Sequence, residues 1–201
     1  KVISLYKKEG FPVILDVKRG DIGKTAEAYA REAFDFFDAD AVTLSPYLGY
    51  DSIAPYSEGY PDKGLYILNK TSNKSSGEIQ DVVCGDMPLF LHVSKKIVDW
   101  YCAGMGAVVG ATYPEELERI SNLFEESGKH VPLLIPGVGK QGGSVEEVVT
   151  ILKKYGDAEI HRINSSSAIN YAYKKHPDMN FDDAAVRALD ELNNEINVIL
   201  R

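Results

Sequence analysis

The sequence is poor in the residues that build disulfide frameworks and metal centres. Only two cysteines occur among 201 residues, Cys84 and Cys102, and neither belongs to a Cys-x-x-Cys motif. The four histidines are scattered, and none stands at metal-ligand spacing from a cysteine. A disulfide-rich fold and a structural zinc site are therefore not expected. Unpaired thiols are typical of a reducing compartment.

The chain also lacks a signal peptide, an apolar run of about 18 residues and an excess of basic side chains. Thirty acidic residues outnumber 22 lysines and arginines, which gives a formal net charge of −8. That charge argues against binding to nucleic acid or to an anionic membrane. We therefore expect a cytoplasmic, soluble protein, and the net charge does not argue against a small anionic ligand in a local basic pocket.

What the chain does contain is a regular alternation of short apolar runs with helical patterns. The runs are rich in Val, Ile, Leu and Ala, as expected of parallel strands buried on both faces. They cover residues 13–17, 41–45, 65–68, 107–111, 133–135 and 160–163. Apolar periodicity and capping signals predict helices over residues 24–37, 93–103, 114–124, 145–155 and 182–197. The alternation predicts one α/β domain over residues 1–201.

Two architectures fit this alternation, a doubly wound open sheet and a (β/α)₈ TIM barrel. A complete barrel typically needs about 250 residues and eight strands. The chain begins without Met, and residues 1–10 have the pattern of a helix that ends at Gly10. We favour the barrel, and we expect that about two N-terminal β/α units are absent from the chain.

Charged residues follow the first apolar run in the pattern Asp16-x-Lys18-x-x-Asp21. Residues two apart on a strand share a face, so Asp16 and Lys18 should point the same way, with Asp21 in the next turn. An ammonium between two carboxylates is costly to bury, and such clusters gather at catalytic sites. The alternative is a surface ion pair, with Asp21 capping the following helix.

Polar or glycine-rich segments also follow the later strands, at residues 45–47, 70–73, 136–143 and 164–167. In a barrel the carboxyl ends of the strands carry the active site, and the last two loops often bind phosphate. Glycines at positions 137, 139, 142 and 143 let backbone amides approach an anion closely. Serines at 165–167 add hydroxyl donors. These residues predict a phosphate site, and simple loops are the alternative.

Four segments together resemble orotidine 5′-phosphate decarboxylase, in its longer-chain branch. They are residues 15–25 (Leu-Asp-Val-Lys-Arg-Gly-Asp-Ile-Gly-Lys-Thr), 70–73, 109–117 and 135–143. Their order is that of the family, and the resemblance covers nearly the whole chain. It implies a TIM barrel and a carboxy-lyase that converts orotidine 5′-phosphate to uridine 5′-phosphate in pyrimidine biosynthesis. It also implies no metal, no cofactor, and a homodimer with shared active sites.

The resemblance gives each site residue a role. Lys18 would protonate C6 of the pyrimidine, and Asp16 would press on the substrate carboxylate, so that strain is relieved as carbon dioxide leaves. Asp21, the third catalytic residue, would reach with Ile22 and Thr25 into the partner's site. The other substrate-binding residues implied are Thr71, Ser72, Pro136, Gly137, Gly139, Gln141, Ser166 and Ser167.

Two features depart from the family pattern. A second lysine and a substrate-binding aspartate of the family would lie before Lys1, and the family's phosphate-binding arginine is Ser167 here. One hydroxyl does not replace a bidentate guanidinium contact, although Lys140 or Arg162 could compensate in part. Two other functions stay open: a metal-dependent sugar-phosphate decarboxylase of the same superfamily, with Mg²⁺ on the strand-end acids, and a non-catalytic nucleotide-phosphate binder.

Overall fold

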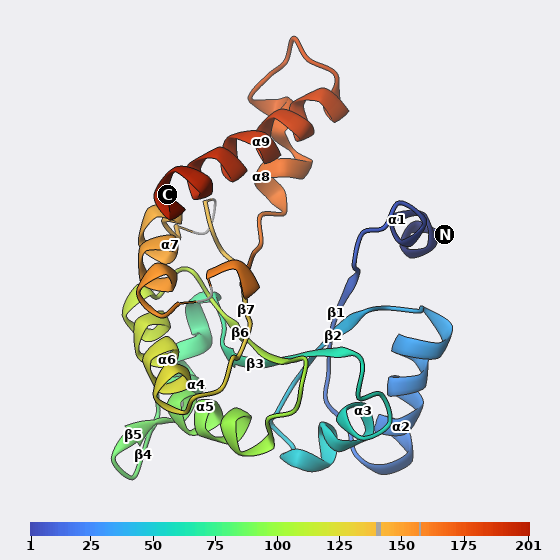
Figure 1. Cartoon of the computed structure of the whole chain (residues 1–201), viewed down its shortest axis with the longest axis vertical. Coiled ribbons are helices and arrows are strands. Elements are labelled where there is room, and N and C mark those ends of the chain that lie inside the picture. Colours follow the sequence, from blue (N-terminus) through green and yellow to red (C-terminus); the bar gives the residue numbers. More distant parts are fainter. Residues whose placement is uncertain (140–141, 157) are drawn as a thin grey trace. The chain divides into compact units, whose positions relative to one another are not determined.

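The computed structural model describes residues 1–139, 142–156 and 158–201 (Figure 1). The chain forms two compact units. The first unit contains Lys1–Asn69, Gly77–Val108 and Val131–Leu133, and the second contains Lys70–Ser76, Val109–His130 and Leu134–Arg201. A single domain over residues 1–201 stays a prediction. Within the described ranges, no helix has the length and apolarity needed to cross a membrane.

Parallel strands form the core of the first unit. In hydrogen-bonded order they are β1 (Ile14–Arg19), β2 (Ala41–Leu44), β3 (Gly64–Lys70) and β6 (Met105–Val109), and the last residues of β3 and β6 belong to the second unit. β2 and β6 are buried at every residue. Continuous apolar runs predict this pattern, because such strands are covered on both faces.

The helices of the first unit lie before and between its strands. They are α1 (Val2–Lys8), α2 (Gly23–Arg31), α3 (Ala54–Ser57), α4 (Gly77–Gln80) and α5 (Leu89–Trp100). The helix predicted over residues 24–37 is divided, because α2 passes into a π-helical turn at Glu32–Phe36. The helix predicted over residues 93–103 begins earlier, at Leu89, directly after Pro88. A short hairpin, β4 (Val83–Cys84) with β5 (Met87–Pro88), has no counterpart in the sequence prediction.

In the second unit, β7 (Leu133–Ile135, whose first residue belongs to the first unit) pairs in parallel with β8 (Arg162–Ile163). β8 is shorter than the predicted strand over residues 160–163, because a 3₁₀ turn occupies Ala158–Ile160. The helices are α6 (Pro114–Glu126), α7 (Val145–Lys154), α8 (Ser167–Asn170) and α9 (Phe181–Leu200). Short 3₁₀ turns also occur at Lys74–Ser76 and Ala172–Lys174 in this unit, and at Tyr50–Ser52 in the first unit.

Helix α7 shows how local sequence positions an element. The Ser144 hydroxyl caps its first turn by accepting the Glu147 N–H at 3.2 Å, as the sequence predicts. Its apolar side chains are buried, and α7 contacts both α6 and α9. At its C-terminal end the Lys154 ammonium lies 2.7 Å from Glu118 of α6. Burial of the apolar stripe, rather than the exposed ion pair, supplies most of the stabilisation.

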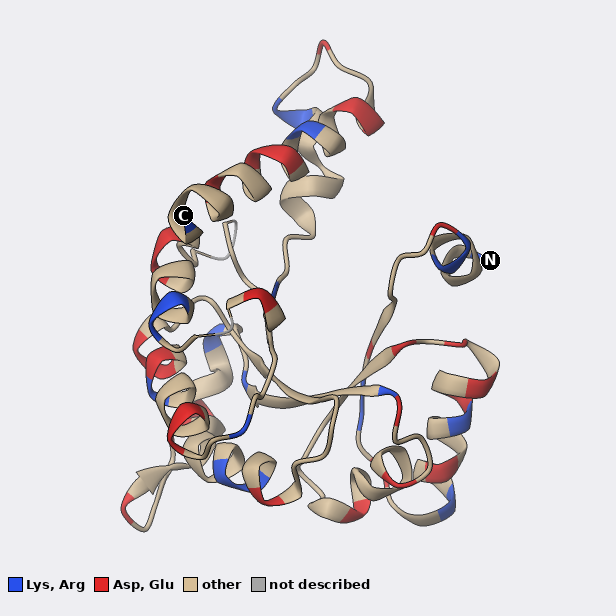
Figure 2. Ribbon diagram, in the orientation of Figure 1, with Lys and Arg blue, Asp and Glu red and all other residues tan. Residues whose placement is uncertain are grey.

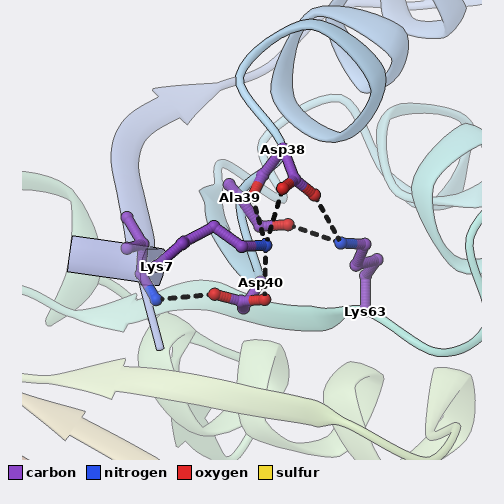
Figure 3. Close-up of polar contacts among 6 residues, drawn as sticks. Lys7, Asp38, Ala39, Asp40 and Lys63 are labelled. Carbon is purple, nitrogen blue, oxygen red and sulfur yellow. Dashed lines mark hydrogen bonds and ion pairs between the residues drawn. The ribbon is translucent and has the colours of Figure 1, made fainter. Parts of the chain in front are cut away.

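A network of two lysines and two aspartates fixes the start of β1 in the first unit (Figure 3). The Lys7 ammonium lies 3.0 Å from the carboxylates of both Asp38 and Asp40. The other oxygen of Asp40 accepts the Val13 N–H at 2.8 Å. Lys63 lies 3.9 Å from Asp38. Both aspartates are thus held in ion pairs.

The network also shifts the pKa values of Asp40 and Lys7. Burial alone would raise the pKa of Asp40, but the Val13 N–H and the Lys7 ammonium stabilise the carboxylate, and the net pKa lies below its usual value. The hydrogen bonds to Asp40 and Asp38 raise the pKa of Lys7. Lys7 and Asp40 are therefore both charged throughout the neutral range.

Candidate active site

Asp16 and Lys18 lie on β1 of the first unit and form an ion pair. The Lys18 Nζ atom is 2.6 Å from Oδ1 of Asp16, as expected for residues that share a strand face. The Lys18 and Asp16 side chains are 51% and 60% exposed, so water screens the pair. An exposed pair of this kind contributes about 1 kcal/mol at most. The sequence argument from the cost of burial therefore does not apply to this pair, which has the geometry of a surface ion pair.

The backbone at Lys18 gives a better reason to regard this strand end as a functional site. Lys18 has a φ of 50°, in the left-handed region that non-glycine residues seldom adopt. Leu15 pairs with Val42 and Arg19 with Leu44, so residues 16–18 of β1 stand opposite one residue of β2. Such a bulge re-aims side chains, and backbone strain of this kind clusters at active sites.

The residue opposite the bulge is Thr43, which sequence reasoning missed. Its hydroxyl oxygen accepts the Lys18 N–H at 2.9 Å, and the hydroxyl donates to Oδ1 of Asp16, also at 2.9 Å. Thr43 is 1% exposed. The only signal in the sequence is a polar residue in the middle of an apolar run.

The turn after β1 carries Asp21, Ile22 and Thr25. Oδ1 of Asp21 accepts the N–H of the adjacent Ile22 at 2.9 Å. Ile22 is itself the N-cap residue of α2, so the prediction that Asp21 caps this helix is wrong. Ile22 is 53% exposed, and Thr25 is exposed as well. Both side chains are therefore accessible on the first turn of α2.

In the second unit, the loop after β6 joins the loops after β3 and β7. The Gly110 N–H donates to the Lys70 carbonyl at 2.7 Å, and the Ala111 N–H donates to the Pro136 carbonyl at 2.8 Å. The Lys70 side chain is fully buried, with its ammonium 4.6 Å from the centre of the Tyr113 ring. These contacts bring the loops that hold Ser72 and Pro136 to one rim of the second unit.

Ser72 is held closely against this rim. A Cβ at Gly110 would lie 2.8 Å from the backbone of Ser72, so only glycine fits there. The Thr112 hydroxyl donates to the Ser72 carbonyl at 3.3 Å. The neighbouring Thr71 donates its hydroxyl to the Asn73 side-chain oxygen at 2.7 Å. The Ser72 backbone is thus held between Gly110 and Thr112.

The glycine-rich segment after β7 folds back on itself. The Gly139 N–H donates to the Gly143 carbonyl at 3.0 Å, and the Gly143 N–H donates to the Gly137 carbonyl at 3.2 Å. Gly137 and Gly139 have φ angles of 98° and 80°, which glycine adopts without strain. Gln141 and Lys140, both proposed as ligand contacts, lie outside the described residues.

Ser166 and Ser167 lie at the start of α8, where Ser166 is the N-cap residue. The Arg162 guanidinium donates to the carbonyls of Glu159 and His161, both at 2.8 Å. These partners precede β8, whereas the serines follow it. The expectation that Arg162 compensates for the missing arginine at position 167 therefore finds no support.

The two units offer different chemistry. The strand end of β1 presents an ammonium beside a carboxylate, an arrangement that can hold negative charge and deliver a proton. The loops of the second unit carry hydroxyls suited to a polar ring and an anion, whereas the N–H groups of Gly139 and Gly143 are used within the glycine-rich loop itself. Acidic residues and lysines or arginines both lie along the helices (Figure 2). No group of three or more potential metal ligands occurs among residues 1–139, 142–156 and 158–201.

Comparison with protein-family models and with known proteins identifies the family and several relatives of this chain. The family model described as "Orotidine 5'-phosphate decarboxylase / HUMPS family" matches residues 1–176. Orotidine 5′-phosphate decarboxylase of Ralstonia nicotianae is 45% identical over 190 residues, which cover 94% of this chain and 67% of the relative. The enzyme of Azoarcus sp. strain BH72 is 47% identical over 167 residues, 82% of this chain and 60% of the relative. The chain spans 60–67% of the length of these two relatives.

Solved structures of an OMP decarboxylase and of a UMP synthase also resemble this chain. The Leishmania donovani OMP decarboxylase matches with a TM-score of 0.80 and 36% identity, over 95% of this chain and 69% of that one. The Leishmania donovani UMP synthase matches with a TM-score of 0.79 and 37% identity, over 95% of this chain and 40% of that one. These likenesses confirm the α/β barrel class. That further β/α units precede Lys1 stays a prediction.

Proposed function

Because this chain belongs to the orotidine 5′-phosphate decarboxylase / HUMPS family, we propose that its protein decarboxylates orotidine 5′-phosphate to uridine 5′-phosphate in pyrimidine biosynthesis. The observation that carries the proposal is the Asp16–Lys18 pair, 2.6 Å apart, at a strained bulge of β1. The activity is proposed for the whole protein, since the chain spans only part of its relatives.

In the proposed mechanism, the Asp16 carboxylate lies against the carboxylate of the substrate. Two like charges about 4 Å apart repel each other by about 4 kcal/mol at an effective dielectric constant of about 20. Cleavage of the bond from C6 to the carboxylate releases carbon dioxide and relieves this repulsion, so the barrier falls. The electron pair stays on C6, where the Lys18 ammonium stabilises it and then donates its proton.

Residues of the second unit bind the rest of the nucleotide in this proposal. Ser72, beside Thr71, donates to the pyrimidine, and Pro136 lines the base pocket. The phosphate lies between the glycine-rich loop after β7 and the serines at the start of α8, whose hydroxyls donate to it. The residues assigned to this part are Gly137, Gly139, Gln141, Ser166 and Ser167. The hydrogen bonds that join the loops after β3, β6 and β7 support this assignment.

The proposal includes a homodimer with shared sites, in which Asp21, Ile22 and Thr25 reach the partner's substrate. The exposure of Ile22 and Thr25 on the first turn of α2 supports it. A cytoplasmic location is also part of the proposal, and it rests on the unpaired cysteines in the sequence.

Incubation of the full-length protein with orotidine 5′-phosphate tests the proposal. We expect loss of the substrate's absorbance and formation of uridine 5′-phosphate at equal rates with EDTA and with added Mg²⁺. Activity that requires Mg²⁺ would favour the metal-dependent sugar-phosphate decarboxylase instead. Calorimetric binding of uridine 5′-phosphate without any turnover would favour a non-catalytic binder, which Ser167 makes the second candidate.

A further inference from the structure

We propose that Thr43 is a positioning residue for this site, because one hydroxyl holds both the Asp16 carboxylate and the strained backbone of Lys18. The effect on catalysis rests on the proposed function. The hydrogen bonds themselves do not, so they can be tested separately.

The bulge explains why a side chain is needed at this position. Residues 16–18 of β1 stand opposite Thr43 alone, so the regular exchange of backbone hydrogen bonds between β1 and β2 is interrupted. Buried backbone N–H groups are nearly always paired. Here the Thr43 Oγ1 atom accepts the Lys18 N–H at 2.9 Å. The Thr43 side chain thus takes the place of a backbone carbonyl of β2 as acceptor, and it supports the left-handed conformation of Lys18.

The direction of each hydrogen bond follows from donor and acceptor chemistry. A backbone N–H can only donate and an ionised carboxylate can only accept, so the single Thr43 proton points to Asp16, 2.9 Å away. The Asp16 carboxylate in turn accepts the Lys18 ammonium at 2.6 Å. The three residues close a ring that begins at the Lys18 backbone and ends at its side chain. The hydroxyl therefore fixes the ammonium and the carboxylate relative to each other.

Packing holds the hydroxyl in place. Thr43 is 1% exposed, in a strand whose four residues are all buried. Its branched Cβ restricts rotation about χ1, so the hydroxyl is directed at β1 with little entropic cost. Valine has nearly the same shape without the hydroxyl, and serine keeps the hydroxyl without the methyl group. These two substitutions separate positioning from packing.

Steady-state kinetics give the first test. A misplacement of about 1 Å in a catalytic group costs about 100-fold in rate. We expect Thr43→Val to lower kcat by about 10-fold to 100-fold while KM for orotidine 5′-phosphate changes less than about 3-fold. Thr43→Ser should keep kcat within about 3-fold of the wild type. Thr150→Val, on the exposed side of α7, is the matched control and should leave kcat and KM unchanged.

Amide hydrogen exchange at Lys18 gives a second test that does not require activity. Thr43→Val should raise the exchange rate of the Lys18 N–H at least about 10-fold, since its acceptor is removed. Thr43→Ser and Thr150→Val should leave that rate unchanged. If Thr43→Val does not fold, Thr43→Ala and Thr43→Ser form the replacement pair, because they differ only in the hydroxyl.

The outcomes separate this inference from the proposed function. A wild-type protein that does not decarboxylate overturns the function, while the exchange rate still tests the role of Thr43. An active wild type with normal kcat in Thr43→Val overturns the inference. Equal losses in Thr43→Val and Thr43→Ser also overturn it, because they assign the effect to packing. Unchanged Lys18 exchange in Thr43→Val overturns it whatever the activity.

Discussion

Removal of the Asp40 carboxylate should loosen the start of the strand that carries Lys18. Asp40 accepts the Val13 N–H at 2.8 Å with one oxygen and binds Lys7 with the other (Figure 3). A hydrogen bond to a charged group contributes about 1.5–3 kcal/mol. The Asp40 side chain is 38% exposed, so solvent reduces this to about 1–2 kcal/mol. We expect Asp40→Ala to lower the melting temperature by about 2–8 °C.

Thermal and urea unfolding of the full-length protein measure this effect. Asp62→Ala is the matched control, because Asp62 is an exposed aspartate of the same unit. The control should melt with the wild type, within about 1 °C. Equal melting temperatures for Asp40→Ala and the wild type would refute the view that this network anchors β1.

The stabilisation by Asp40 and Lys7 should also depend on pH. The folded pKa of Asp40 is lowered, so its stabilisation is complete above the unfolded value of about 3.9 and is lost as the pH falls through the folded value. The pKa of Lys7 is raised, so its contribution is complete below about 10.4 and is lost as the pH rises through the folded value. The difference between Asp40→Ala and the wild type should therefore be widest near neutral pH. A difference that grows on acidification would contradict the argument.

Three further substitutions test other parts of the molecule. Ser167→Arg adds a bidentate phosphate contact and should tighten uridine 5′-phosphate binding by about 10-fold to 100-fold in calorimetry; unchanged affinity would count against the phosphate site. Gly110→Ala places a Cβ 2.8 Å from Ser72 and should cost about 1–3 kcal/mol of unfolding free energy in urea, so wild-type stability would contradict the close approach. Burial raises the pKa of Tyr56 to about 12, and its hydroxyl has no hydrogen-bond partner in the part of the chain that the structure describes. Tyr56→Phe should therefore melt at or above the wild-type temperature, and a clear drop would show a missed partner.

Features set by neighbouring residues could be predicted from the sequence. Continuous apolar runs located the six parallel strands found in the part of the chain that the structure describes, because strands buried on both faces need no alternation. Pro114 and the Ser144 cap located the starts of α6 and α7, since both signals act within one turn. The β4–β5 hairpin escaped prediction because its strands have two residues each, too few for a pattern.

The pairing of Asp16 with Lys18 could be predicted, because strand geometry places residues two apart on one face. Features set by distant residues could not be predicted. The role of Thr43 depends on the register between β1 and β2, and a bulge changes that register locally. The pairing of Lys7 with Asp40 joins residues 33 positions apart. No local pattern encodes contacts of this kind.

We propose that Lys18 delivers the proton to C6, and the kinetics of a Lys18 variant examine that role without relying on any other residue. Turnover of orotidine 5′-phosphate should be compared for the wild type, Lys18→Ala and Lys95→Ala, the last at an exposed lysine of α5. General acid catalysis contributes about 100-fold to 10,000-fold, and Lys18 also stabilises the carbanion, so we predict a loss in kcat of at least about 1,000-fold for Lys18→Ala. Its melting temperature should match that of the wild type, and Lys95→Ala should be fully active. A folded Lys18→Ala protein with normal kcat would contradict the account.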